Sequence, residues 1–222
     1  MGFDPRADEL QKTETRQRII ETGFRIFSEN TIDAVNLTEV AEAAGLGMAT
    51  VYRHFGGKTP LVIAIGAWSW DSYLREYLQK QKKQGMTGAE DYEFFLDSFI
   101  DLYENHRDIL RFNQFFNIYV MREGILGKDD FAPYRKVLLV LSERFHQTYD
   151  MGRKDGTLKT EVPEKKMFLR SLHLMLAVIT RYAVGLVYEG DEDPREEILF
   201  LKDMLIKEFV RIRSEERNGF CF

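Results

Sequence analysis

Residues 36–58 read NLTEVAEAAGLGMATVYRHFGGK, and this stretch decides the fold of the N-terminal region. Asn36 is followed three residues later by Glu39, a spacing typical of a capping box at the start of a helix. The helix is expected to end near Gly45, because glycine readily adopts the left-handed conformation that closes helices. A second short helix is predicted from about Met48 to residue 54. Two short helices joined by a tight glycine-containing turn form a helix-turn-helix.

A longer amphipathic helix is predicted before this motif, over about residues 14–29. Its apolar face carries Ile20, Phe24 and Phe27. Gly23 lies in its middle and costs about 1 kcal/mol relative to alanine. We therefore expect Gly23 to let another helix approach closely.

The rest of the chain also predicts helices. Apolar residues recur at three- and four-residue spacing, and the sequence shows no sustained two-residue alternation. Proline suits the first turn of a helix, and three prolines stand where helices are expected to start: Pro60, Pro163 and Pro194. The sequence predicts an all-α fold, with long helices over about residues 60–81, 164–189 and 195–214.

The composition is that of an ordinary globular chain. Its 222 residues carry a formal net charge of −5, 44% are hydrophobic and 13% are aromatic, which excludes a disordered chain. The longest apolar run, residues 61–68, is too short to span a membrane, and the acidic N-terminus is unlike a signal peptide. We therefore expect a cytoplasmic protein. Cys221 is the single cysteine, so neither an intrachain disulfide nor a cysteine-based metal site is expected.

The motifs of common enzymes are missing. Gly57, Lys58 and Thr59 imitate the end of a phosphate-binding loop, but that motif requires a glycine where Tyr52 stands. The four histidines lack metal-ligand spacing, and the sequence contains no G-x-S-x-G motif. We expect no enzymatic activity, no cofactor and no metal.

Residues 15–61 resemble the N-terminal DNA-binding domain of the TetR family of transcriptional regulators. The matching positions are Arg18-Ile19-Ile20, Phe27, the run from Val40 to Gly45, the run from Thr50 to Phe55, and Lys58. The resemblance implies a homodimeric, ligand-responsive repressor, with a helix-turn-helix DNA-binding domain over 1–60 and a larger helical effector-binding and dimerisation domain over 61–222. Thr31, Gly47 and Ala49 depart from the family pattern, so the operator sequence cannot be inferred from the resemblance.

The second short helix would enter the major groove of double-stranded operator DNA. The resemblance implies that Thr50, Tyr52 and Arg53 face the DNA, and it makes His54 and Lys58 candidates for phosphate contacts. Further candidates for DNA contact are Asn36, Thr38, Met48 and Ala49. The alternative is that Tyr52 and His54 only pack against the neighbouring helix.

The charge of this region is low for a nucleic-acid-binding domain. Residues 1–60 contain seven Lys and Arg against nine Asp and Glu. Binding remains consistent with this balance if the acids point away while Lys12, Arg16, Arg18, Arg53 and Lys58 face phosphates. We therefore expect modest non-specific affinity with a weak dependence on salt.

The region after Leu61 contains 24 of the 29 aromatic residues. They predict a pocket for a small apolar or aromatic effector, although a helical body of this size also needs aromatic side chains for its core. The candidates for ligand contact are Trp68, Phe112, Phe116, Asn117, Tyr119 and His173. Gly66 is a possible hinge through which ligand binding would reorient the DNA-binding domains.

The last two helices carry wide apolar faces and resemble a dimerisation unit. The candidates for the interface are Phe168, Leu172, Met175, Ile179, Leu201, Leu205 and Phe209. A two-fold dimer would recognise a near-palindromic operator. Two alternatives remain open: a helical small-molecule binding protein with a vestigial DNA-binding head, and a helical enzyme without a recognisable motif.

Overall fold

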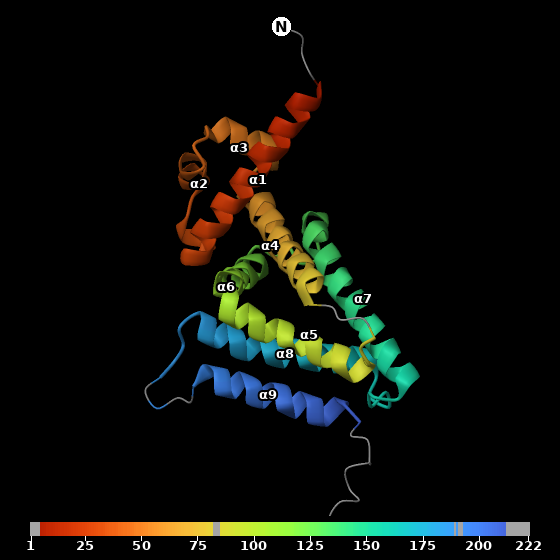
Figure 1. Cartoon of the computed structure of the whole chain (residues 1–222). Coiled ribbons are helices and arrows are strands. Elements are labelled where there is room, and N and C mark those ends of the chain that lie inside the picture. The colour runs from red at the N-terminus through yellow and green to blue at the C-terminus, as the bar shows by residue number, and fades with distance from the viewer. Residues whose placement is uncertain (1–4, 82–84, 189, 191–192, 212–222) are drawn as a thin grey trace, which may run out of the picture. The chain divides into compact units, whose positions relative to one another are not determined.

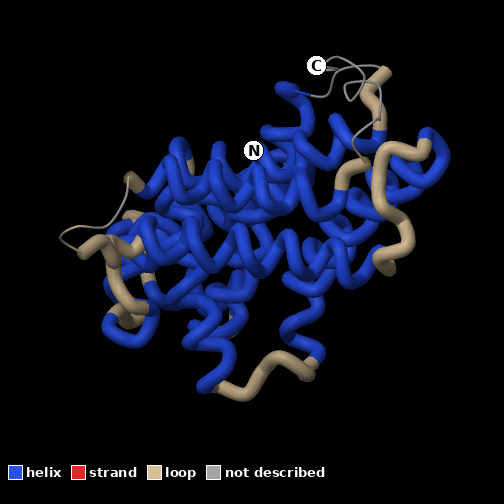
Figure 2. The backbone as a smooth tube through the Cα atoms, turned by 90° about the horizontal axis from the view of Figure 1, so that it is seen from below, coloured by secondary structure: helices blue, strands red, loops and turns tan. Residues whose placement is uncertain are grey.

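The computed structural model describes residues 5–81, 85–188, 190 and 193–211. The predicted all-α fold is confirmed, since helices joined by loops form the described part of the chain, with no strand in it (Figure 2). The α-helices are α1 (Pro5–Glu29), α2 (Leu37–Ala43), α3 (Met48–Phe55), α4 (Lys58–Gln81), α5 (Gly88–Asn105), α6 (Arg107–Arg122), α7 (Ala132–Asp155), α8 (Glu164–Ala183) and α9 (Pro194–Phe209). Two 3-10 helices, η1 (Ile32–Ala34) and η2 (Asp129–Phe131), lie between them. None of the described helices is both long and apolar enough to cross a membrane.

The chain divides into two compact units. The first contains residues 1–76 and 108–138, and the second contains residues 77–107 and 139–222. Both α4 and α7 therefore contribute residues to each unit. The compact unit that holds the helix-turn-helix is larger than the segment 1–60, because it includes most of α6 and the first turns of α7.

The helix-turn-helix forms as its local sequence predicts. The side chain of Asn36 accepts a hydrogen bond from the Glu39 amide at 3.0 Å, while the Asn36 amide donates to the Glu39 carboxylate at 2.9 Å. This capping box starts α2, and Gly45, with φ of 66°, follows its end. In Figure 1, α1, α2 and α3 lie together in the first unit.

Gly23 allows the close helix approach predicted for it. A Cβ atom built on Gly23 would lie 2.7 Å from Cδ1 of Ile65 on α4. Gly66 is also a packing position, since a Cβ there would lie 3.0 Å from the ring of Phe116 and 3.2 Å from the ring of Tyr134. This close packing gives a structural reason for glycine at position 66, and its role as a hinge stays a prediction.

The second unit is built around α5, α8 and α9, which lie side by side (Figure 1). Tyr92 of α5 is fully buried, and its ring contacts those of Phe145 and Phe209. Beside this core, Arg144 of α7 forms a bidentate ion pair with Asp91 of α5. Its two terminal guanidinium nitrogens lie 2.5 and 2.7 Å from the two carboxylate oxygens. Thr148 also donates to this carboxylate at 2.6 Å, so the buried charge is fully hydrogen-bonded.

The two C-terminal helices are shorter than predicted. Helix α8 ends at Ala183 rather than near residue 189, and Gly185 adopts a positive φ of 83° just beyond it, as helix-closing glycines do. Helix α9 ends at Phe209. The predicted end near residue 214 lies outside the described residues.

Candidate nucleic-acid interface

Helix α3 has one buried face and one open face. Val51 is 0% exposed and Phe55 is 8% exposed, whereas Tyr52 is 52% exposed. Arg53 is exposed beside Tyr52. The fully buried Val51 and the largely buried Phe55 fix α3 against the unit, so the open face presents an aromatic phenol and a guanidinium to an incoming ligand.

Two small residues, Gly47 and Ala49, flank Met48 at the start of α3. Gly47 is its N-cap, and its carbonyl accepts a hydrogen bond from the Thr50 amide at 2.9 Å. Ala49 is exposed, while Met48 and Thr50 are half-buried. A helix N-terminus with small neighbours allows close approach to a groove of DNA.

Asn36 and Thr38 are exposed at the start of α2. The side chain of Asn36 already caps this helix, so its carbonyl oxygen is committed to the Glu39 amide. Capping uses only this acceptor oxygen, so both the side-chain NH2 of Asn36 and the hydroxyl of Thr38 can donate a hydrogen bond to a phosphate.

His54 is half-buried at the last turn of α3. Burial lowers the pKa of its imidazole, and the positive charges of Arg53, Arg16 and Lys12 lower it further. The ring is therefore neutral near pH 7 and would meet a phosphate as a hydrogen-bond donor rather than as a cation.

Lys58 points inward instead of toward solvent. Its ammonium donates a hydrogen bond of 2.5 Å to the carbonyl of Val35, in the segment that joins η1 to α2. Burial lowers the pKa of this ammonium. Lys58 thus fixes the loop before α2 with one of the three N–H groups of its ammonium, which leaves the other two to donate to a phosphate.

Three contacts within the first unit join α6 to η1, α4 and α1, which pack around the helix-turn-helix. Arg122 forms an ion pair with Asp33 of η1. Tyr119 shares a hydrogen bond of 2.8 Å with Thr59, the second residue of α4, and the Arg111 guanidinium donates to the Ser28 carbonyl of α1 at 3.4 Å. These partners are 60 to 89 residues apart in the chain, so no local sequence signal identifies them.

The predicted ligand residues are divided between the two units. Phe112, Phe116 and Tyr119 are buried in the core of the first unit, whereas Asn117 is exposed on α6. His173 is exposed on α8, which belongs to the second unit. Among the six candidates, Trp68 alone lines the cleft that lies beside α1, α3 and α4.

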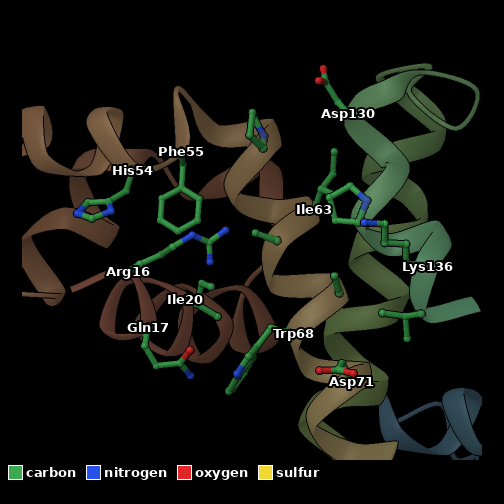
Figure 3. Close-up of a pocket in the computed structure, with 15 residues that line it drawn as sticks. Arg16, Gln17, Ile20, His54, Phe55, Ile63, Trp68, Asp71, Asp130 and Lys136 are labelled. Carbon is green, nitrogen blue, oxygen red and sulfur yellow. The ribbon is translucent and has the colours of Figure 1, made fainter. Parts of the chain in front are cut away.

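A cleft of about 600 Å³ opens in the first unit (Figure 3). It is lined by residues of α1, α3, α4, η2 and the first turns of α7. Ala67 and Trp68 of α4 contribute apolar surface, and Arg16 of α1 and Lys136 of α7 contribute positive charge. The sequence did not indicate this site, because its residues come from segments that only the fold brings together.

The predicted dimer-interface residues of α8 and α9 differ in their burial, and the interface itself stays a prediction. Met175, Ile179, Leu205 and Phe209 are at most 4% exposed inside their own unit, and Phe168, Leu172 and Leu201 are half-buried. The outward apolar side chains are Leu174, Phe200 and Met204, at 47%, 64% and 50% exposed. Each precedes a predicted residue by one position, which is a rotation of about 100° around the helix.

The described residues contain no group of His, Cys, Asp and Glu side chains that could hold a metal ion. Their buried side-chain nitrogen and oxygen atoms all have hydrogen-bond partners. What the first unit presents is an open face of α3 and a separate cleft.

Comparisons with known proteins agree with this geometry. The family model for bacterial regulatory proteins of the tetR family matches residues 19–65, which contain α2 and α3. A helix-turn-helix transcriptional regulator of Staphylococcus aureus strain MRSA252 is 28% identical over 159 residues, or 72% of this chain and 78% of the relative. A regulator of the same type from strain USA300 is 32% identical over 66 residues, which span 36% of its length.

Solved structures show the same fold. A transcriptional regulator from Saccharomonospora viridis in complex with choline superposes with a TM-score of 0.71 at 16% identity, over 90% of this chain and all of that one. The fatty acid degradation regulator FadR from Bacillus halodurans superposes with a TM-score of 0.67 at 14% identity, over 93% of this chain and 97% of that one. At these identities the likeness concerns the fold alone.

Proposed function

Because the chain belongs to the TetR family of transcriptional regulators, we propose that it is a homodimeric repressor that a small effector releases from a palindromic operator. Regulators of this family bind DNA through the helix-turn-helix and are not enzymes. We place the activity in the cytoplasm, where bacterial DNA lies.

The open face of α3 is the observation that carries the proposal. Tyr52 and Arg53 are exposed, while the residue before them, Val51, is fully buried. A helix of this kind fits the major groove of B-DNA, which is about 12 Å wide and presents a distinct pattern of donors and acceptors for each base pair. The groove-facing side chains would be Thr50, Tyr52 and Arg53, with the hydroxyl of Thr38 on the backbone.

Dimerisation would use the outward apolar side chains of α8 and α9. Leu174, Phe200 and Met204 expose apolar surface that a second copy would cover. A two-fold dimer presents two copies of α3, which read successive major grooves when they lie about 34–36 Å apart. The operator would then be a near palindrome.

Effector release would act through α6. Its ties to Asp33, Thr59 and Ser28 hold the DNA-binding elements in one arrangement within the first unit. A ligand that binds more tightly to a second arrangement shifts the population toward it, and the two copies of α3 then lose their register on the operator.

Selection from a fragment library of genomic DNA tests the proposal. The purified protein is incubated with the fragments at low and at moderate salt, and the retained DNA is sequenced. We expect enrichment of one near-palindromic site, and its loss with the Tyr52→Ala variant. The absence of any enriched site, from a folded protein, would favour a small-molecule binding protein with a vestigial head, which the excess of acidic residues in 1–60 supports.

A further inference from the structure

We propose that the cleft between α1, α3, α4 and the first turns of α7 binds a small carboxylate with an aromatic or branched apolar body. The binding step stands on the cleft alone. Its consequence for DNA, given below, rests on the proposed function.

The size and the walls of the cleft suit such a ligand. Its volume of about 600 Å³ lies within the usual range for small-molecule sites, about 300–1,000 Å³. Ile20 and Ile63 lie behind its walls and are at most 3% exposed, so the apolar surface within reach of a ligand comes from half-buried residues such as Ala67 and Val137. Trp68 is half-buried and presents part of its ring surface to the cleft.

Two cations face the cleft without a carboxylate partner among the described residues. The Arg16 guanidinium lies over the Phe55 ring, 4.7 Å from its centre, and this contact holds it at the α1 side. Lys136 extends from α7 toward α4 on the opposite side (Figure 3). Both are exposed and neither forms an ion pair in the described part of the chain, so both are available to a ligand anion.

The two acids of the cleft do not cancel this positive charge. Asp71 pairs with Arg75 one turn further along α4. Asp130 stands at the edge of the cleft on η2, away from Arg16 (Figure 3). His54, which also lines the cleft, is neutral near pH 7 because its pKa is lowered. Its ring therefore offers a hydrogen bond without adding a charge.

Occupation of the cleft would weaken DNA binding. Arg16 is a candidate for phosphate contact, and a ligand carboxylate would compete with phosphate for the same guanidinium. The ligand would also contact His54 and Phe55 at the end of α3. By linkage, an anion that binds the free protein better than the DNA complex lowers operator affinity by the same factor.

The test uses the whole protein and three matched probes: para-tert-butylbenzoate, its neutral amide, and para-tert-butylbenzylammonium. Binding is measured by titration calorimetry and by tryptophan fluorescence. The chain has two tryptophans, of which Trp68 lines the cleft while Trp70 is buried and bonded to Asn113. We expect the benzoate to bind at least tenfold more tightly than the amide and the ammonium, and Trp68→Phe to remove the fluorescence change while heat is still released.

Variants locate the site. Arg16→Gln and Lys136→Gln should each lower benzoate affinity about tenfold and leave amide affinity unchanged. Arg25→Gln, an exposed arginine outside the cleft on the same helix, is the matched control and should bind the benzoate as the wild type does. Because both cleft cations are on the surface, these variants should keep the unfolding midpoint, and either one suffices if the other does not fold.

Three results would overturn the proposal: equal affinity for benzoate and amide, tighter binding of the ammonium, or no binding of the benzoate at millimolar concentration. An effect of Arg25→Gln equal to that of Arg16→Gln would do the same, since it would show a general charge effect. Benzoate binding without any DNA binding would support the cleft and refute the proposed function, so the two failures are distinguishable.

Discussion

Tyr52 has the most exposed aromatic ring of the helix-turn-helix, and its neighbour Val51 is fully buried. We predict that Tyr52→Ala lowers operator affinity by about 1–3 kcal/mol, because the ring would be removed from the groove while the core is untouched. The unfolding midpoint should stay close to that of the wild type, as expected for an exposed position. Fluorescence anisotropy with labelled operator measures the first effect, and circular dichroism measures the second.

Tyr188 provides the matched control. It is 63% exposed and lies outside the helix-turn-helix. Tyr188→Ala should leave operator affinity unchanged. Wild-type affinity of the Tyr52→Ala variant would show that this side chain does not contact DNA.

His54 should make DNA binding depend on pH. The pKa of its imidazole in the free protein lies below the ordinary 6.5, so the ring takes up a proton only as the pH falls below that value. A nearby phosphate favours the protonated ring, so operator affinity should rise as the pH falls from about 7.5 to about 5.5 at constant ionic strength. The His54→Gln variant should show a flatter profile, whereas identical profiles would exclude His54 from the interface.

The lowered pKa of His54 should affect folding stability in the opposite direction to operator affinity. The unfolded chain binds a proton at His54 near pH 6.5, while the folded chain, with its lowered pKa, does not. Between the lowered pKa and 6.5 the unfolded state therefore holds more protons, and the free energy of unfolding decreases as the pH falls through this window.

At the scale of elements, α5 and α7 approach most closely at a pair of glycines in the second unit. A Cβ on Gly88 would lie 2.1 Å from Cα of Gly152, and a Cβ on Gly152 would lie 2.3 Å from the side chain of Leu158. The start of α5 is also bonded here, since the Gly88 amide donates to the Asp155 carboxylate at 2.6 Å. The backbone of α7 cannot yield cheaply, so the contact requires glycine.

We therefore predict that Gly88→Ala lowers the free energy of unfolding by about 2 kcal/mol. For a chain of this size, the midpoint of thermal unfolding should fall by about 4–8 °C. Gly127→Ala is the control, because a Cβ at Gly127 meets nothing within 4 Å. An equal midpoint for the two variants would show that the helices separate easily at this point.

At the scale of the whole molecule, two apolar surfaces are candidates for the interface of the proposed dimer. One is formed by Leu174, Phe200 and Met204 on α8 and α9. The other includes Met121 of α6, which is 67% exposed. We predict that Phe200→Glu and Met204→Glu convert the dimer into a 26.1 kDa monomer, because a buried carboxylate without a partner is costly. Light scattering during gel filtration measures the mass.

Met121→Glu introduces the same charge outside the predicted interface and should remain dimeric. The monomeric variants should also lose most of their operator affinity, since each would present a single recognition helix. If Met121→Glu were monomeric while Phe200→Glu remained dimeric, the result would show that the interface lies on α6 and not on α8 and α9.

Helix caps and helix boundaries could be predicted from the sequence, because they depend on local hydrogen bonds and on the periodicity of apolar residues. Asn36 and Glu39 are three residues apart, and their capping box forms as predicted. Helix α2 ends just before Gly45, and α3 begins at Met48, both as predicted. These features depend on residues within one or two helical turns, so the spacing of residue types was sufficient to predict them.

Contacts between segments far apart in the chain could not be predicted from the spacing of residue types. On α8 and α9, apolar residues surround much of each helix, so periodicity alone could not distinguish the inward Met175 from the outward Leu174. The inward bond of Lys58 to Val35, the ion pair of Arg122 with Asp33, and the cleft beside Arg16 join segments that are 23 or more residues apart. The sequence by itself determined the all-α class, the helix-turn-helix and its caps, because those depend on short-range hydrogen bonds and side-chain spacing. Only the tertiary structure decided which helix faces remain exposed and which charges meet at the cleft, because these depend on how the helices pack.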